Sequence, residues 1–426
     1  MLKVVDYKDS AALIKAMRGR ASTVNAEVTE TVSAIIARVA AEGDTAVRTY
    51  TERFDGVKLE ALEVDREAIL GALQNSDPTF VSALTRAKSN IEAFHARQKT
   101  QSFIDTGADG VILGQRVRGL ERVGLYVPGG TAAYLSSVLM NAVPAQIAGV
   151  KEIIMVTPPG RDGQPNPDIL AAAAICGISR VFMVGGAQAV AALAYGTESI
   201  PKVYKIVGPG NIYVATAKKL LFGVVDIDMI AGPSEILIMA DDTANPEYVA
   251  ADMLSQAEHD VLASAILLTT SRRVAEETQA ALRRQTDVLP RKAFIEQSLE
   301  GYGAIILCET NDQLVEAANI MAPEHLEVLM EDPFEYIGRI DNAGSIFLGS
   351  YSPEPVGDYY AGPNHVLPTS GTARFFSPLS VDSFVKRSSF IYYTQEALAK
   401  AGADIITIAT KEGLDAHANA VKVRLD

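Results

Sequence analysis

Basic charge and long hydrophobic runs are scarce in this 426-residue chain. Its 52 acidic residues outnumber its 38 lysines and arginines, which leaves a formal net charge of −14. That balance argues against general binding to nucleic acid or to anionic membranes, which usually needs a basic surface. It still permits a small anionic ligand, because backbone amides at helix N-termini can bind phosphate. No apolar run reaches the roughly 18 residues that a membrane-spanning helix needs, so we expect no membrane span.

Cysteine is also scarce, and the two residues present, Cys176 and Cys308, lie in apolar stretches. Two isolated thiols make no disulfide framework and fit a protein of the reducing cytoplasm. The amino terminus lacks the apolar core of a signal peptide, which agrees with a cytoplasmic location. We expect both thiols to be buried and neither to be catalytic.

The first hundred residues predict helices. Apolar residues from Val28 to Val39 keep a helical period, and Gly43 ends the run. A second long helix follows Asp77-Pro78 and carries an apolar stripe from Phe80 to Phe94. His95 lies beside that stripe, and we expect it to be a partly exposed structural residue.

Farther along, short apolar runs alternate with helical stretches. This alternation predicts βαβ units, and therefore an α/β fold with parallel sheets. We expect two such domains, with a boundary near Gly232-Pro233. The predicted strands are 123–127, 152–156, 181–184, 204–207, 235–239, 265–269, 304–307, 326–330 and 345–348.

A helix predicted from Pro246 to Asp260 carries a possible ligand pair. Asn245 is a good N-cap and Pro246 suits the first helical position. Gln256 and His259 lie one turn apart on a face that also includes Asp252, so both could hold one ion or one polar ligand. The competing interpretation is the ordinary surface edge of an amphipathic helix, since a Gln–His pair alone is a weak metal signal.

Three glycine-rich turns follow predicted strands, and each precedes a predicted helix. They are Tyr126-Val-Pro-Gly-Gly130, Val184-Gly-Gly-Ala-Gln188 and Val207-Gly-Pro-Gly-Asn211. Glycine at such a turn lets a ligand approach the backbone at the positive end of a helix. Together the turns suggest a crevice for a dinucleotide or phosphate. Simple tight turns remain an alternative, because none contains a GxGxxG or Walker pattern.

Polar residues with proton-transfer or metal-binding chemistry are spread along the second half. Glu324 and His325 stand side by side after Pro323, a pair that suits water activation or proton transfer. Residues 349–378 form a long irregular segment with Asp358 and His365, which we expect to be functional. His417 lies in a predicted final helix, 411–424. Imidazole, carboxylate and amide groups of this kind can make an open zinc site.

These residues occur in long blocks that closely resemble the L-histidinol dehydrogenase family, the zinc enzymes of the last two steps of histidine biosynthesis. The resemblance runs from about residue 22 to the end of the chain. Its blocks include 121–130, 207–215, 231–235, 254–260, 322–327, 362–369 and 412–417.

The resemblance implies an α/β fold of two incomplete Rossmann-like domains, similar to aldehyde dehydrogenases, with small terminal extensions that form an intertwined dimer. The implied division is an N-terminal extension (1–21), a domain with the metal and catalytic residues (22–125 plus 234–379), an NAD-binding domain (126–233) and a C-terminal extension (380–426).

The resemblance also implies the site. Zinc would be held by Gln256, His259, Asp358 and His417, the last of them reaching in from a partner subunit. His325 matches the general base and Glu324 the residue that activates water. The substrate-contacting positions would be Ser234, Gln256, His259, His325, Asp358, Glu412 and His417, and the NAD+ contacts would be Tyr126, Gln188 and Asn211.

The implied reaction is the oxidation of L-histidinol to L-histidine through histidinal, with two hydride transfers to NAD+. Three other functions stay open at this point. They are a related zinc- and NAD-dependent dehydrogenase for another small polar alcohol, a zinc hydrolase that needs no NAD+, and a non-catalytic dimeric binding protein.

Overall fold

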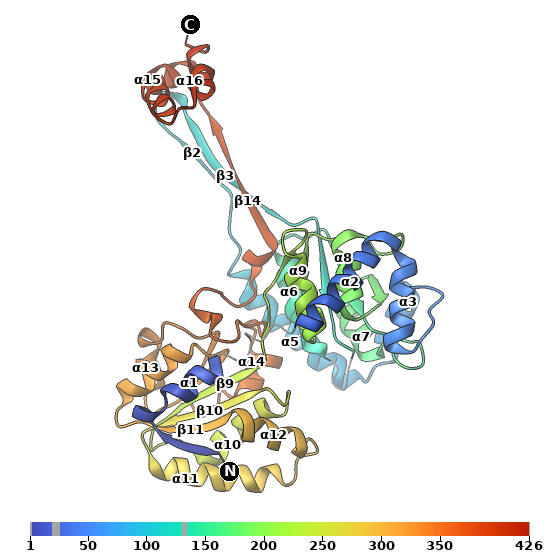
Figure 1. Ribbon diagram of the computed structural model, residues 1–426, viewed down its shortest axis with the longest axis vertical. Coiled ribbons are helices and arrows are strands. Elements are labelled where there is room, and N and C mark those ends of the chain that lie inside the picture. Colours follow the sequence, from blue (N-terminus) through green and yellow to red (C-terminus); the bar gives the residue numbers. More distant parts are fainter. Residues whose placement is uncertain (1, 19–25, 130–133, 426) are drawn as a thin grey trace.

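A computed structural model describes residues 2–18, 26–129 and 134–425. Positions 19–25 lie outside these ranges, and they include the end of the expected N-terminal extension and its boundary with the next domain. Gly130, in the first glycine turn, also lies outside them. The chain builds two parallel sheets covered by helices, and a three-stranded arm projects from them (Figure 1). Each described helix is too short or too polar to cross a lipid bilayer.

The larger sheet has six parallel strands in the order β1-β11-β10-β9-β12-β13. Helices α10, α11 and α12 cover one face, and α1 and α13 cover the other. Strands β9 and β10 are buried along their whole length, which explains their continuous apolar sequences. The elements are β1 (Lys3–Asp6), α1 (Ala11–Arg18), β9 (Glu235–Ala240), α10 (Pro246–Ala257), β10 (Ser264–Thr269), α11 (Arg272–Thr286), α12 (Lys292–Tyr302), β11 (Gly303–Leu307), α13 (Asn311–Met321), β12 (His325–Leu329) and β13 (Ser345–Leu348).

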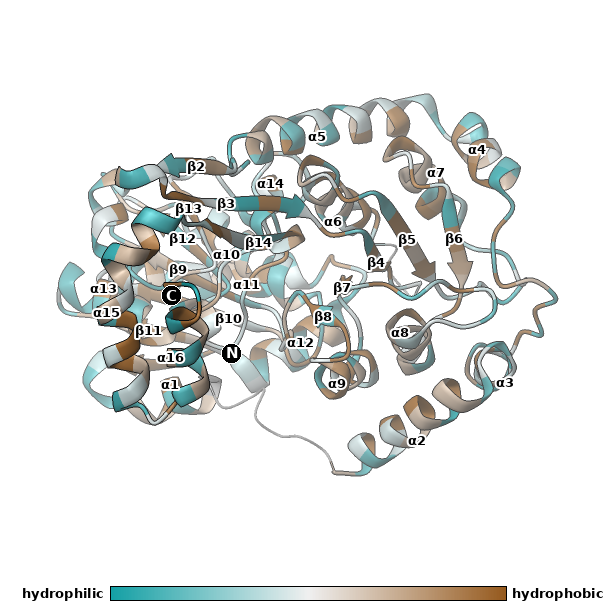
Figure 2. Cartoon of the chain, turned by 90° about the horizontal axis from the view of Figure 1, so that it is seen from above, coloured by the Kyte–Doolittle hydropathy of each residue, from teal (hydrophilic) through white to brown (hydrophobic). Residues whose placement is uncertain are grey.

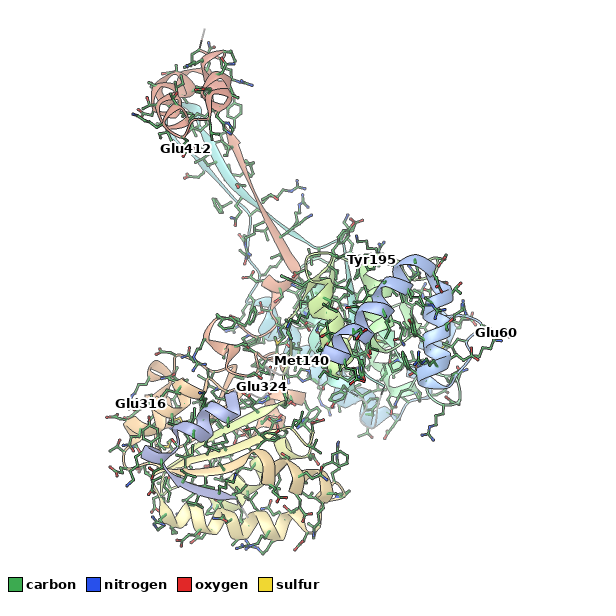
Figure 3. All side chains as sticks on the ribbon, viewed as in Figure 1. Glu60, Met140, Tyr195, Glu316, Glu324 and Glu412 are labelled. Carbon is green, nitrogen blue, oxygen red and sulfur yellow. The ribbon has the colours of Figure 1, made fainter. Side chains whose placement is uncertain are left out.

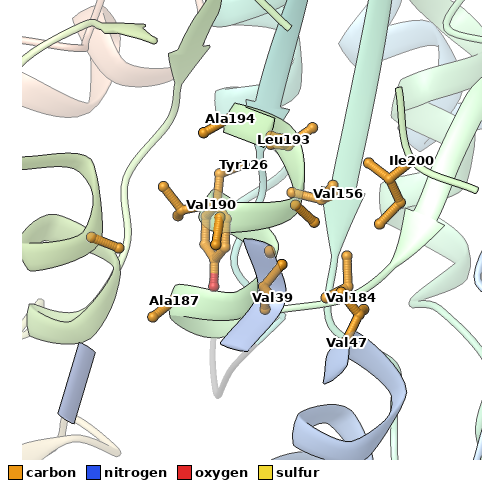
Figure 4. Packing of buried hydrophobic residues seen from close by; sticks show 14 of the residues in the cluster. Val39, Val47, Tyr126, Val156, Val184, Ala187, Val190, Leu193, Ala194 and Ile200 are labelled. Carbon is orange, nitrogen blue, oxygen red and sulfur yellow. The ribbon is translucent and has the colours of Figure 1, made fainter. Parts of the chain in front are cut away.

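The smaller sheet has five parallel strands in the order β6-β5-β4-β7-β8. One face packs against α4, α5, α6 and α7, and the other against α2, α3, α8 and α9. Figure 4 shows part of the second core, in which Tyr126 lies among valines and alanines. The elements are α2 (Ala26–Glu42), α3 (Asp44–Asp55), α4 (Arg66–Asn75), α5 (Pro78–Ala96), β4 (Arg122–Tyr126), α6 (Leu135–Ile147), β5 (Glu152–Thr157), α7 (Pro167–Ile175), β6 (Arg180–Met183), α8 (Gly186–Tyr195), β7 (Lys205–Val207), α9 (Ile212–Leu221) and β8 (Asp226–Ile227).

This packing groups the chain differently from the expected division. Helices α2 to α5 lie against the smaller sheet, although residues 22–125 were expected to belong with the metal-binding domain. Strand β1 pairs with β11, so part of the N-terminal extension completes the larger sheet. The difference arises because the apolar face of a helix shows that the helix packs against something, but not which sheet it covers. Helix α5, for example, shows both hydrophobic and hydrophilic residues along its length (Figure 2).

The arm consists of antiparallel strands and two terminal helices. Strands β2 (Phe103–Thr106), β3 (Ile112–Gly119) and β14 (Val385–Tyr392) lie in the order β14-β3-β2. At its tip, α15 (Gln395–Lys411) and α16 (Asp415–Lys422) lie far from both sheets (Figure 1). The predicted final helix, 411–424, was therefore placed across the turn between α15 and α16. Gly413, with φ of 74°, makes that turn.

Candidate active site

The residues with proton-transfer chemistry gather at the amino edge of the larger sheet. His325 begins β12, where it is aligned with Ile236 of β9 and Ser345 of β13. Helix α10 follows β9 and runs back along the sheet, which brings its last turn to the same edge. The segment after β13 supplies a short helix, α14 (Glu354–Tyr359). One edge of the sheet thus receives side chains from β12, α10 and α14.

His325 is held with one ring nitrogen free. Its Nδ1 lies 2.9 Å from the carbonyl oxygen of Glu235, so Nδ1 carries the proton and donates it. Nε2 is then the acceptor nitrogen, and it is buried without a hydrogen-bond partner among the described residues. Burial lowers the pKa of His325 below its ordinary value of 6.5. The imidazole is therefore neutral at pH 7 and can accept a proton at Nε2.

Glu324 lies immediately before His325 and is also buried. One of its carboxylate oxygens accepts a hydrogen bond of 2.9 Å from the backbone N–H of Glu235. The same oxygen lies 3.7 Å from Nδ1 of His325. Burial raises the pKa of Glu324 well above its ordinary value, so the carboxylate binds a proton more readily than a solvated one would.

Three side chains beside His325 could hold a metal ion. A ligand atom of His259, one of Glu354 and one of Asp358 all lie within 4.8 Å of one another. His325 Nε2 lies 3.9 Å from Asp358 and 4.0 Å from Glu354, so the proton acceptor faces this cluster. Imidazole nitrogen with carboxylate oxygen is a ligand set that suits zinc.

Gln256 provides an observation that fits a bound cation. Its side chain is 1% exposed, and its Oε1 has no hydrogen-bond partner in the described part of the chain. Its amide nitrogen lies 3.3 Å from Nδ1 of His259. An orphaned amide oxygen costs folding free energy unless a ligand satisfies it, and a cation beside His259 would do so. The surface-edge interpretation of this pair was wrong, because Gln256 is buried. The helix was also predicted three residues too long, since α10 ends at Ala257.

Glu354 was missed by the sequence interpretation. It is 2% exposed, accepts a hydrogen bond of 3.1 Å from Ser255, and bonds to Asp358 on the same short helix. Burial raises its pKa to about 7. The spacing of Glu354 and Asp358 is i and i+4, which puts both carboxylates on one face of a helix. That spacing was the available signal, but Pro353, Pro355 and Gly357 concealed the helix.

A second pair of carboxylates lies behind this group. Glu327 is fully buried on β12 and bonds to the Asp252 side chain of α10. Glu327 also accepts a hydrogen bond of 2.8 Å from the backbone N–H of Glu354 at the start of α14. Burial raises the pKa of Asp252 to about 6, so the pair can share a proton. Asp252 therefore supports the neighbouring strand and does not belong to the ligand cluster.

His365 joins the cluster to the other body of the molecule. Its Nδ1 lies 3.1 Å from the Asp358 carbonyl oxygen, and its Nε2 lies 3.5 Å from the Ser137 hydroxyl in the first turn of α6. Asn364 donates a bond of 2.7 Å to the Met140 carbonyl of the same helix. Residues 364–365 thus fix the position of the segment that carries Glu354 and Asp358 against the α6 face of the smaller sheet.

The predicted residues of the C-terminal extension are not near this site within one chain. Glu412 lies exposed at the tip of the arm, whereas Glu324 lies in the body (Figure 3). His417 is exposed on α16, at the same tip (Figure 1). Ser234, by contrast, lies at the site edge just before β9, and its carbonyl accepts a bond from Ser264. A single subunit therefore assembles Ser234, Gln256, His259, Glu324, His325 and Asp358, but not Glu412 or His417.

The predicted cofactor residues lie at the carboxyl edge of the smaller sheet. Tyr126 ends β4, and its hydroxyl accepts a bond of 3.0 Å from the backbone N–H of Gly186 at the start of α8. Asn211 caps α9 by accepting bonds from the Tyr213 and Val214 amides. Gln188 is 1% exposed, and its Oε1 lacks a partner among the residues described. The turns after β6 and β7 therefore bring two helix N-termini to one edge, together with the Gln188 oxygen that has no described partner.

The third of these turns needs glycine for steric reasons. A Cβ on Gly208 would collide with the Tyr126 backbone, and Gly208 has φ of 115°. Beneath this turn, Lys218 and Asp228 form a buried ion pair, and both also bond to the Gly208 backbone. Close backbone approach therefore explains this glycine without reference to a ligand.

The remaining expectations concern isolated residues. Both cysteines are free and buried, and burial raises the pKa of each to about 12, which agrees with unreactive thiols. The expectation for His95 was wrong. Its side chain is fully buried, with Nδ1 2.9 Å from the Ile91 carbonyl and Nε2 3.4 Å from Asn364. The apolar stripe from Phe80 to Phe94 gives no information about which segment covers α5. Residues 362–365 cover the helix and bury His95.

Fold and site together define an α/β enzyme in which a buried histidine and carboxylates can move protons beside a cluster that could hold a cation. The family model of histidinol dehydrogenase matches residues 18–425. The chain therefore belongs to the histidinol dehydrogenase family and is an oxidoreductase.

Individual relatives agree over nearly the full length. The chain is 57% identical over 415 residues to histidinol dehydrogenase of Listeria monocytogenes, with 97% of each chain covered. It is 55% identical over 416 residues to that of Clostridium acetobutylicum, covering 98% of this chain and 96% of the relative. Among solved structures, histidinol dehydrogenase from Elizabethkingia anophelis is similar with a TM-score of 0.94 at 39% identity, covering 100% of this chain and 98% of that one.

Proposed function

We propose that this protein oxidises L-histidinol to L-histidine through L-histidinal, the final reaction of histidine biosynthesis, and uses NAD+ and a zinc ion. Membership of the histidinol dehydrogenase family supports the substrate and the pathway. The observation that carries the mechanism is the unpartnered Nε2 of His325, which faces the His259–Glu354–Asp358 cluster.

Gln256, His259 and Asp358 of one subunit would hold the metal, together with His417 of the partner subunit. When bound, zinc would fix and polarise the polar groups of the substrate, and NAD+ would accept one hydride in each of two oxidations. The orphaned Gln256 oxygen supports this ligand set.

In the first step, His325 takes the hydroxyl proton of histidinol at Nε2 while a hydride leaves the carbinol carbon. Nδ1 keeps its proton because the Glu235 carbonyl accepts it, so the ring becomes positively charged only during the step. A general base of this kind typically contributes about 100- to 10,000-fold to the rate.

In the second step, water adds to the aldehyde, and the hydrate loses the second hydride to give the carboxylate. Glu324 takes a proton from that water, a role that suits its raised pKa. Four electrons leave the substrate in total, so two NAD+ are consumed for each histidinol. Water supplies the additional oxygen of the product.

Glu412, His417 and Ser234 would contact the substrate in a site shared between two subunits. The arm supports this arrangement, because apolar side chains on its strands are exposed in one chain. They include Phe103, Ile104 and Ile391, which are 56%, 70% and 73% exposed. A second subunit would cover them and place the arm tip against the site edge. We also propose a cytoplasmic location.

The stoichiometry of NADH tests the reaction. Two NADH for each histidinol consumed supports the proposal, and the absence of turnover with histidinol would overturn it. Activity without NAD+ would favour a zinc hydrolase. Turnover of another small alcohol, with histidinol inert, would favour a related dehydrogenase.

Mixed dimers test the shared site. A His417→Ala subunit and a His325→Ala subunit should each be inactive alone. Together they should regain activity, because one of the two sites in the mixed dimer then contains both histidines. If no mixture recovers activity while the mixed dimer forms, His417 acts within its own subunit or not at all.

A further inference from the structure

One carboxylate oxygen near the proposed cofactor site has no hydrogen-bond partner among the described residues. Asp55 is the last residue of α3, and its Oδ2 is buried without a hydrogen bond to any described residue. Burial raises its pKa from an ordinary 3.8 to about 6. A buried acceptor in this state costs folding free energy unless something else supplies a donor.

Asp55 lies close to the residues at the carboxyl edge of the smaller sheet. Its charge contributes to the raised pKa of the Tyr126 phenol, which burial mainly causes. The Tyr126 ring points its oxygen toward the start of α8, next to Ala187 (Figure 4). Gln188, in the first turn of that helix, adds a second buried oxygen without a hydrogen-bond partner in residues 2–18, 26–129 and 134–425. Two unsatisfied acceptors therefore lie near the N-terminus of α8.

The face of the smaller sheet on which Asp55 lies indicates which half of the dinucleotide would lie near this carboxylate. Contacts with the metal-binding segment use α5 and α6, through Asn90, Ser137 and Met140, on one face of the smaller sheet. Asp55 and Tyr126 belong to the opposite face, with α3 and α8. Figures 1 and 2 both place α3 on the side of this body that is remote from the larger sheet.

A dinucleotide that delivers its nicotinamide to the metal cluster would extend its adenosine half across this edge. An acidic side chain next to an adenosine ribose can accept bonds from its hydroxyls, and it repels a phosphate at the 2′ position. Pyrophosphate would lie between the two halves, where helix N-termini favour negative charge.

We propose that Asp55 accepts hydrogen bonds from the adenosine ribose hydroxyls of the bound dinucleotide and thereby selects NAD+ over NADP+. This inference rests on the proposed NAD+-dependent function and names a specificity-determining residue for it. Each of the two ribose hydroxyls donates a hydrogen bond to an oxygen of the carboxylate. A 2′-phosphate would instead place negative charge against it.

Equilibrium binding to the full-length protein tests the inference. Titration of wild type, Asp55→Asn and Glu52→Gln with NAD+ and with NADP+ gives both affinities by calorimetry. Asp55→Asn should weaken NAD+ binding about 10- to 100-fold, because a bond to a charged group is replaced by one to a neutral amide. It should also reduce the preference for NAD+ over NADP+ by at least about tenfold. Glu52→Gln makes the same charge change at an exposed position of α3 and should alter neither affinity.

Thermal unfolding without cofactor separates binding from a structural role. Removing the charge of this half-buried carboxylate should leave Tm unchanged or raise it, because its buried Oδ2 has no described partner, whereas a structural carboxylate would lower Tm on substitution. Unchanged NAD+ affinity in Asp55→Asn would overturn the inference and leave the proposed function intact. If wild type itself bound no NAD+, the proposed function would fail as well.

Discussion

The two parallel sheets place their polar sites at opposite edges. In the smaller sheet, Tyr126, Gln188 and Asn211 follow the carboxyl ends of strands, next to the N-termini of α8 and α9. In the larger sheet, His325 begins a strand, and Gln256 and His259 lie at the C-terminal end of α10. Helix N-termini favour anions and helix C-termini favour cations. The same layered fold therefore offers an edge that suits pyrophosphate and an edge that suits a metal ion.

Metal removal should give the largest difference between the effects at the two edges. Chelation, or His259→Asn, should abolish histidinol oxidation, because the amino edge loses its cation, while NAD+ affinity at the other edge changes little. Metal analysis, turnover and NAD+ titration measure the three quantities. Glu258→Gln, at the neighbouring position, should retain metal and activity. Full turnover by metal-free protein would show that the amino edge is no cation site.

Substitution of His325 should have the next largest effect. His325→Gln removes the proton acceptor at Nε2, and kcat should fall about 100- to 10,000-fold with metal content unchanged. Because burial lowers the pKa of His325, the wild-type base stays deprotonated to lower pH than an ordinary histidine. The acid limb of the kcat/KM profile attributable to this group should therefore lie below pH 6.5. A loss of less than tenfold would exclude His325 as the base.

Substitution of Glu354 should have a smaller effect, on metal affinity. Glu354→Gln removes a carboxylate from the cluster with His259 and Asp358, and metal affinity should fall about 10- to 100-fold. Competition with a coloured chelator gives the affinity. Ser255→Ala, which removes only the hydroxyl bonded to Glu354, should cost less. Equal affinity for wild type and Glu354→Gln would mean that this carboxylate only positions α14.

The cysteines should show the smallest effect. Cys176 and Cys308 lie outside both polar edges, and both thiols are buried. Cys308→Ala should keep turnover within about twofold, and iodoacetamide should not inactivate the native protein. Rapid inactivation that histidinol prevents would place a thiol in the site.

Much of the fold was predictable because buried parallel strands leave a strong sequence signal. All nine predicted strands are present, with ends that differ by at most two residues. The resemblance implied a C-terminal extension at 380–426, but the strands of the arm were not predicted, since β2 and β14 are exposed for most of their length and lack a repeating apolar pattern. Residues 22–125 were expected to belong with the metal and catalytic residues, whereas α2 to α5 pack against the smaller sheet, and such packing depends on long-range contacts.

Residues of the site could be predicted to lie together from the sequence only where they are close to each other along the chain. Gln256 with His259, and Glu324 with His325, are neighbours in sequence and meet in space. Their convergence with Asp358 was supplied by the family resemblance, since these segments are distant along the chain. Glu354, Glu327 and Asp55 were missed because acidic residues are common. Burial of the first two side chains, and of one Asp55 oxygen, is what distinguishes them from the rest.

The exposed arm has a consequence for how activity returns after unfolding. Each body can bury its core within one chain, so its folding is a unimolecular event. The arm strands expose apolar side chains on a thin sheet with no interior, and Glu412 and His417 lie at its tip. If those residues complete a neighbour's site, helical signal should recover at a rate independent of protein concentration. Enzyme activity should then recover later, with second-order kinetics set by the encounter of two folded chains.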